Sequence, residues 1–152
     1  MEDWKAEELI MKDLIRILRE GVHSLVVFKD EIFTYDGRGV SDLLRLLNEQ
    51  PEVLDDASIA GKIVGKGAAA LMALGKVKDV YADVISESAL TLLEQEGIRA
   101  TYGKLVPHII NHAGTGMCPV ETRCLPCSTP TECLAEIKAF IEEMKNKKLS
   151  RQ

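Results

Sequence analysis

The chain lacks a long apolar run, a basic N-terminal segment and an excess of positive charge. Its longest apolar stretch, residues 68–74, is far shorter than the roughly 20 residues that cross a bilayer. Residues 1–8 carry acidic side chains where a secretory signal would carry basic ones. The formal net charge of −5 disfavours nucleic-acid binding, because phosphate neutralisation requires clustered lysine and arginine. We therefore expect a cytoplasmic protein without a membrane or nucleic-acid partner.

Two familiar catalytic patterns are also missing. His108 is followed by Ile109, so there is no HExxH zinc-protease motif. Neither Lys62 nor Lys66 is followed by the serine or threonine that holds magnesium in a Walker phosphate loop. The chain therefore carries neither the sequence signature of zincin proteases nor that of P-loop nucleotide hydrolases.

The apolar and turn-forming residues that are present predict a single α/β domain over residues 1–152. Apolar spacing and capping residues predict helices at 4–20, 41–50, 58–74, 86–96 and about 130–146. Strands are expected at 24–28, 32–35, 77–85 and 98–102. The last helix has the clearest start, because residues 129–132 form a capping box with proline at the first helical position. This order predicts a three-layer α/β/α architecture with a mixed sheet of about five strands.

All four cysteines lie within one Cys/His-rich segment, residues 107–133, in which His108 and His112 precede them. The cysteines are Cys118, Cys124, Cys127 and Cys133. In the reducing cytoplasm this clustering is compatible with a metal ion or iron–sulfur cluster, with redox chemistry, or with inert buried thiols. Cys124 and Cys127 form a CxxC pair, which can chelate a metal or form a reversible disulfide. Cys133 is expected in the first turns of the last helix, where a thiol pKa can be depressed.

Three further groups of residues are candidates for ligand binding or catalysis. The small residues of segment 60–70 favour close packing, or a phosphate site at which Lys62 and Lys66 share one helical face. Ser86 is typical of a helix cap, and together with Glu87 and Ser88 it faces the carboxyl edge of the sheet, where ligands bind in open α/β folds. The segment after Pro107 supplies the remaining candidates: Asn111, His112 and Thr115 for a ligand, and Cys118 with Glu121 as a nucleophile and base or as loop anchors.

Four segments together resemble a small prokaryotic family of unknown function with a cytidine deaminase-like fold. They are residues 37–39, 59–70, 80–88 and 107–121, and the resemblance extends over roughly residues 14–121. Deaminases of that fold hold zinc with H-x-E or C-x-E on one helix and P-C-x-x-C on the next. The matching positions here begin at Gly65 and Ser86 and contain no such ligands. The resemblance therefore implies a deaminase-shaped cleft without catalytic zinc, in a protein that is not a zinc-dependent deaminase.

This sequence also departs from the family that it resembles. Gly61 stands where an acidic residue is usual, and Cys124, Cys127 and Cys133 are additions to a single cysteine. Our preferred hypothesis is that the cleft binds a nucleotide or related phosphorylated ligand. The sequence does not identify a reaction. One alternative is a metal, iron–sulfur or redox protein that uses the Cys118–Cys133 cluster. Another is a regulatory or assembly subunit, which would form a homodimer through the glycine- and alanine-rich segment.

Overall fold

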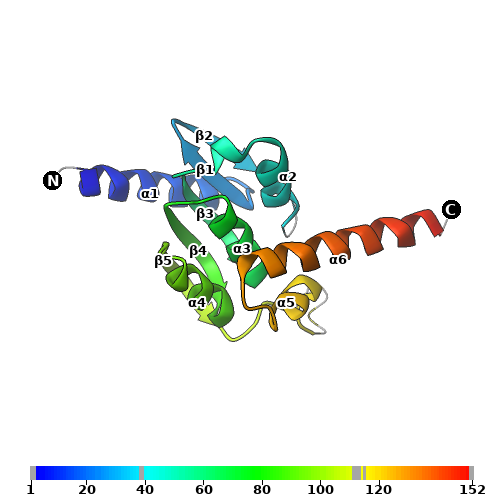
Figure 1. Ribbon diagram of the computed structural model, residues 1–152. Coiled ribbons are helices and arrows are strands. Elements are labelled where there is room, and N and C mark those ends of the chain that lie inside the picture. Colours follow the sequence, from blue (N-terminus) through cyan, green and yellow to red (C-terminus); the bar gives the residue numbers. More distant parts are fainter. Residues whose placement is uncertain (1–2, 38–39, 111–113, 115, 151–152) are drawn as a thin grey trace.

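The computed structural model describes residues 3–37, 40–110, 114 and 116–150 as one series of helices and strands (Figure 1). In chain order the elements are α1 (Asp3–Glu20), β1 (Leu25–Lys29), β2 (Glu31–Tyr35), α2 (Ser41–Glu49), a 3-10 turn η1 (Pro51–Val53), β3 (Ser58–Val64), α3 (Lys66–Leu74), β4 (Asp79–Ser86), α4 (Glu87–Gln95), β5 (Arg99–Val106), α5 (Pro119–Cys124) and α6 (Pro130–Ser150). Within these ranges, no helix is long and apolar enough to cross a membrane.

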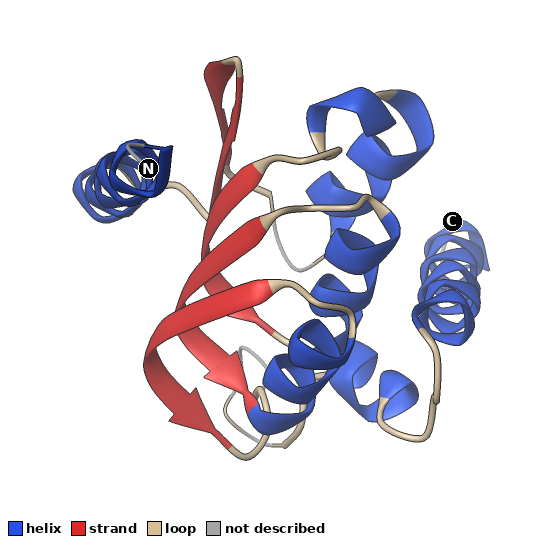
Figure 2. Ribbon diagram, turned by 60° about the vertical axis from the view of Figure 1, so that its left-hand side comes forward, coloured by secondary structure: helices blue, strands red, loops and turns tan. Residues whose placement is uncertain are grey.

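The strands form one mixed five-stranded sheet in the order β2-β1-β3-β4-β5. β1 is antiparallel to both of its neighbours, whereas β3, β4 and β5 run parallel. Figure 2 shows α1 on one face of the sheet and α2, α3 and α4 on the other, with α6 outside α3. The predicted mixed sheet between helices is therefore confirmed, and α6 adds an outer layer on one side.

Burial of apolar side chains explains why helices cover both faces. On one face, Leu14 and Leu18 of α1 pack with Val26, Ala60 and Tyr81 of the sheet. On the other face lies the larger core, to which the inner sides of α2, α3, α4 and α6 contribute buried residues. α1 packs mainly on β1 and β3. The larger core lies under α3 and α4, and these helices begin directly after the parallel strands β3 and β4 end. The candidate site is formed there.

The expected helix over residues 58–74 is wrong, because this segment is two elements. Residues 58–64 form β3, which pairs with β1 on one side and β4 on the other, and only residues 66–74 are helical. A short run of small and apolar residues fits both a buried strand and a buried helix. The two neighbouring strands decide the conformation, since they satisfy the backbone groups of β3 on both of its edges.

The small residues of α3 allow other helices to approach it closely. A β-carbon added to Gly67 would lie 2.5 Å from Val120 Cγ1 of α5 and 3.4 Å from Ile137 Cδ1 of α6. The segment from Gly67 to Met72 is buried by the chain itself. The packing interpretation of this segment is therefore confirmed. The homodimer stays a prediction, but a second copy cannot use a surface that α5 and α6 already cover.

Candidate functional site

The candidate site begins where the neighbouring parallel strands β3 and β4 end and α3 and α4 start. Gly65 is the N-terminal cap residue of α3, and Ser86 caps α4 by accepting a hydrogen bond from the Ala89 backbone N–H. Since β3 and β4 pair side by side, the two helix N-termini lie next to each other. The capping role expected for Ser86 is confirmed. The N-terminus of a helix attracts negative charge, so this edge of the sheet favours an anionic group.

The anionic group at this position is the carboxylate of Glu121. Its Oε1 accepts hydrogen bonds from the Lys66 backbone N–H at 2.8 Å, from Ser86 Oγ at 3.1 Å and from Ser88 Oγ at 3.3 Å. Its Oε2 accepts a 2.7 Å hydrogen bond from the Ile109 backbone N–H. Only 2% of Glu121 is exposed. Glu121 thus links α5 to the starts of α3 and α4 and fills the position that the sequence analysis assigns to a phosphate.

The structure does not join Cys118 to Glu121 as a nucleophile and base. Cys118 is the half-buried N-terminal cap residue of α5. Its backbone N–H donates to the Ile109 carbonyl, and its own carbonyl accepts from the Thr122 backbone N–H and hydroxyl. Among the described residues no hydrogen bond connects the Cys118 thiol with the Glu121 carboxylate. The loop-anchor alternative therefore describes the observed contacts of both residues.

The two candidate lysines do not share a helical face. Lys62 lies exposed in β3, whereas Lys66 is the first residue of α3. The Lys66 ammonium donates to the Leu125 carbonyl at 2.9 Å and to the Cys127 carbonyl at 2.7 Å. These carbonyls belong to the turn after α5, where backbone acceptors need partners. Lys66 thus anchors the CxxC turn, a role that its sequence context did not indicate.

Of the two histidines that precede the cysteines, His108 lies exposed in a bend after β5. His112, Asn111 and Thr115 lie outside the described residues. Three of the eight predicted ligand-binding positions therefore remain predictions without a structural account.

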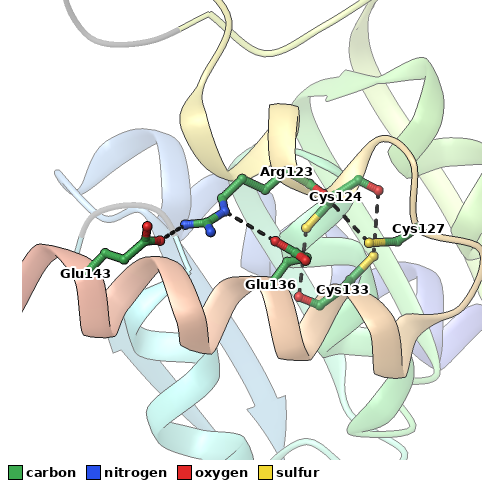
Figure 3. Close-up of polar contacts among 6 residues, drawn as sticks. All are labelled: Arg123, Cys124, Cys127, Cys133, Glu136 and Glu143. Carbon is green, nitrogen blue, oxygen red and sulfur yellow. Dashed lines mark hydrogen bonds and ion pairs between the residues drawn. The ribbon is translucent and has the colours of Figure 1, made fainter.

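Three of the four thiols meet where α5 joins α6 (Figure 3). Cys124 Sγ lies 3.9 Å from the Cys133 carbonyl oxygen, and Cys133 Sγ lies 4.0 Å from that of Cys124. The Cys127 thiol donates to the Arg123 carbonyl at 3.7 Å, and it lies within hydrogen-bonding reach of the Cys133 thiol. Cys124 and Cys133 are fully buried, whereas Cys127 is half-buried. Cys118 is separated from Cys124 by the length of α5, about 9 Å at the helical rise.

The three clustered thiols differ in acidity. The hydrogen bond with Cys124 is the largest cause that lowers the pKa of Cys133, to about 7, and a hydrogen bond with Cys127 and the charge of Lys66 act in the same direction. The same Cys124–Cys133 hydrogen bond raises the pKa of Cys124. Burial is the main cause that raises the pKa of Cys127. The lowered pKa of Cys133 agrees in direction with the depressed pKa expected in the first turns of the last helix, but its causes are the neighbouring thiols and Lys66.

An arginine holds the two helices that carry these thiols together. Arg123 of α5 forms ion pairs with Glu136 at 3.3 Å and with Glu143 of α6 (Figure 3). Its guanidinium also lies 5.8 Å from the centre of the Phe140 ring. No role for Arg123 was predicted from the sequence. The spacing of the acidic and aromatic residues along the last helix is visible in the sequence, but only the fold shows that Arg123 contacts them.

A groove of about 480 Å³ lies beside the thiol cluster. One wall is the exposed side of α4 from Glu87 to its cap residue Glu96, and the other is the turn from Cys127 to Pro130. Lys66 also lines this groove. Three predicted ligand-binding residues, Lys66, Glu87 and Ser88, therefore come together with one predicted thiol. The described residues contain no group of three or more His, Cys, Asp or Glu side chains placed to hold a metal ion, and the metal alternative stays a prediction.

The comparisons with known proteins concern the family and the fold. A family described as "TM1506: Domain of unknown function (DUF1893)" matches residues 13–141. The chain is also similar to the crystal structure of a DUF1893 family protein (TM1506) from Thermotoga maritima, with a TM-score of 0.77 and 23% sequence identity. That similarity covers 85% of this chain and 88% of the other, and at this identity it shows the fold alone. No curated protein matches the chain.

Proposed function

Because the chain belongs to the DUF1893 family of domains of unknown function, we propose a function from its own geometry, namely reversible thiol–disulfide chemistry at Cys127 and Cys133. The observation that carries this proposal is that a half-buried thiol lines a groove and lies within hydrogen-bonding reach of a more acidic thiol. A groove of this size is typical of small-molecule sites.

The division of exposure and acidity assigns the two thiols different roles. Cys127 is the thiol that an incoming reagent can reach, since Cys133 is fully buried. Cys133 carries the lower pKa, so its thiolate is available to attack a sulfur bonded to Cys127. Lys66 holds the Cys127 carbonyl, and Arg123 holds α5 on α6. These contacts keep the two sulfurs close before any reagent binds.

The chemical balance requires an external disulfide, RS–SR. Cys127 loses its proton, and its thiolate attacks the disulfide, forming Cys127–S–SR and releasing RS⁻, which takes up a proton to become RSH. The Cys133 thiolate then attacks the Cys127 sulfur, forming the Cys127–Cys133 disulfide and releasing the second thiol after protonation. Two protein thiols are oxidised and one small disulfide is reduced. In the opposite direction, two small thiols reduce the protein.

The test treats the fully reduced protein with bis(2-hydroxyethyl) disulfide, a small neutral reagent. We expect the protein to lose two free thiols and two hydrogen atoms of mass, and peptide mapping to find Cys127 joined to Cys133. In Cys133→Ser, the mixed disulfide on Cys127 should accumulate instead. Reaction confined to Cys118, or a disulfide that excludes Cys133, would contradict the proposal. So would retention of all four thiols.

A nucleotide-like ligand is a second candidate, because Lys66, Glu87 and Ser88 line the same groove. The carboxylate of Glu121 occupies the N-terminus of α3, and Lys66 is engaged by two carbonyls. A ligand in the groove would therefore make its main contacts through its base and sugar. Thermal-shift measurements with matched nucleosides and nucleotides test this: stabilisation by a nucleoside is the expected result, and no stabilisation by any member would contradict it.

We also propose that the fold is a cytidine deaminase-like scaffold that functions without zinc, and that the protein is cytoplasmic. The adjacent starts of α3 and α4 support this relationship, and Glu121 fills the space between them. An anionic side chain surrounded by N–H and O–H donors does not suit a site in which a cation is held by thiolates or histidines. Elemental analysis of purified protein tests the proposal, and a divalent ion bound between Gly65 and Ser86 would overturn it.

A further inference from the structure

The walls of the thiol groove are charged unevenly. Glu87 and Glu96 line the α4 side, and both side chains are exposed. In the described part of the chain no ion pair neutralises either carboxylate. On the opposite side, Ser128 lines the groove and its backbone N–H donates to the carboxylate of Glu132, which brings a third negative charge to that rim.

The positive charge in the groove is already partnered. Among the described residues that line the groove, Lys66 is the only lysine or arginine. Its ammonium donates to two carbonyls of the CxxC turn, so it acts on the turn and on the neighbouring thiols. An incoming molecule that approaches Cys127 therefore passes between carboxylates, in a protein whose net charge is −5. A cleft lined by one sign of charge concentrates molecules of the opposite sign.

We propose that the groove selects amine-bearing, cationic low-molecular-weight disulfides and thiols as the reagents of Cys127, and discriminates against carboxylate-bearing ones. This inference rests on the proposed thiol–disulfide chemistry and adds its substrate class. The reaction is the exchange described above, in which each cationic disulfide is reduced to two aminothiols while Cys127 and Cys133 are oxidised. Glu87 and Glu96 recognise the ammonium group and do not take part in bond making.

The test compares three small disulfides of similar length and different charge. These are cystamine, which is a dication, bis(2-hydroxyethyl) disulfide, which is neutral, and 3,3′-dithiodipropionate, which is a dianion. Each rate of Cys127–Cys133 formation is divided by the rate of the same reagent with an unstructured cysteine peptide, which removes intrinsic reactivity. We expect the corrected rate to be about tenfold higher for cystamine than for the dianion at low ionic strength, and the ratio to fall as salt is added.

Matched variants identify which carboxylates cause the selection for cationic disulfides. The double variant Glu87→Gln with Glu96→Gln should bring the corrected rates of the three reagents close together. Glu94→Gln should keep the wild-type order, because Glu94 is an exposed residue of α4 that does not line the groove. Equal corrected rates in the wild-type protein would overturn the charge selection and leave the thiol chemistry intact. If none of the three reagents forms the disulfide, the thiol chemistry itself is refuted.

Discussion

Replacing Glu121 tests whether one buried carboxylate holds the site together. In Glu121→Gln the side chain keeps its shape, but one carboxylate oxygen becomes an NH₂ group. If the remaining oxygen faces Lys66, Ser86 and Ser88, the new NH₂ group faces the Ile109 backbone N–H. Two donors then oppose each other in a buried position. In the reverse orientation the NH₂ group faces the Lys66 backbone N–H, whereas the Ser86 and Ser88 hydroxyls can rotate and accept from it. Either orientation therefore leaves one backbone N–H opposite a donor.

The magnitude follows from the bonds that are lost. A hydrogen bond to a charged group contributes about 1.5–3 kcal/mol, and an unsatisfied buried donor costs about 1–3 kcal/mol. Glu121→Gln should therefore lower the free energy of unfolding by about 3 kcal/mol. Glu121→Ala removes every acceptor and should cost about 5 kcal/mol, at the upper end of the range for a broken buried charge network. For a domain of this size, 3 kcal/mol corresponds to a Tm decrease of about 6–12 °C.

Urea denaturation followed by circular dichroism measures the change, with thermal unfolding as a second probe. Glu94→Gln is the matched control, because it makes the same substitution on an exposed face of α4 and should change stability by less than about 0.5 kcal/mol. If Glu121→Gln unfolds within about 1 kcal/mol of the wild type, the donors around Glu121 find other acceptors. The reasoning that this carboxylate fixes α5 on α3 and α4 would then be refuted.

Two further predictions concern helix packing and thiol acidity. Gly67→Ala should lower the free energy of unfolding in urea by about 1–3 kcal/mol, because its β-carbon would overlap Val120. Gly116→Ala, which has open space around the added β-carbon, should leave stability unchanged. Equal effects of the two substitutions would refute the close approach of α5 to α3. The Cys124 hydrogen bond and Lys66 lower the pKa of Cys133 independently of the Cys127 thiol, so resolution of a preformed mixed disulfide on Cys127 should accelerate as pH rises, with a midpoint below the ordinary thiol pKa. A stopped-flow midpoint near the ordinary thiol value of about 8.5 would contradict the assigned acidity.

Local signals in the sequence were sufficient for the elements with clear ends. The α1 helix, the β1–β2 hairpin, the Ser86 cap of α4 and the capping box of α6 all lie where the sequence predicts them. In α6 the box is shifted by one residue, because the Glu132 carboxylate accepts from Ser128 and not from Thr129. These features depend on residues a few positions apart, so their physical causes are visible in the linear pattern.

The segment around Gly61 shows where local pattern was insufficient. Its small and apolar residues suit a buried strand as well as a buried helix, and pairing with β1 and β4 selects the strand. That change moves Lys62 away from Lys66 and removes the predicted lysine pair. The sequence could not show this, because the strands that pair with β3 are determined by the whole sheet.

By itself, the sequence determined the α/β class, the position of most helices and strands, and the concentration of thiols in residues 118–133. The tertiary structure decided which of these groups meet. Lys66 contacts Glu121, Leu125 and Cys127 across 55–61 positions of the chain, and the groove forms only where α4 lies beside the α5–α6 turn. Helix caps and periodicity arise from near neighbours, whereas the partners of a buried charge or a thiol depend on how distant elements pack.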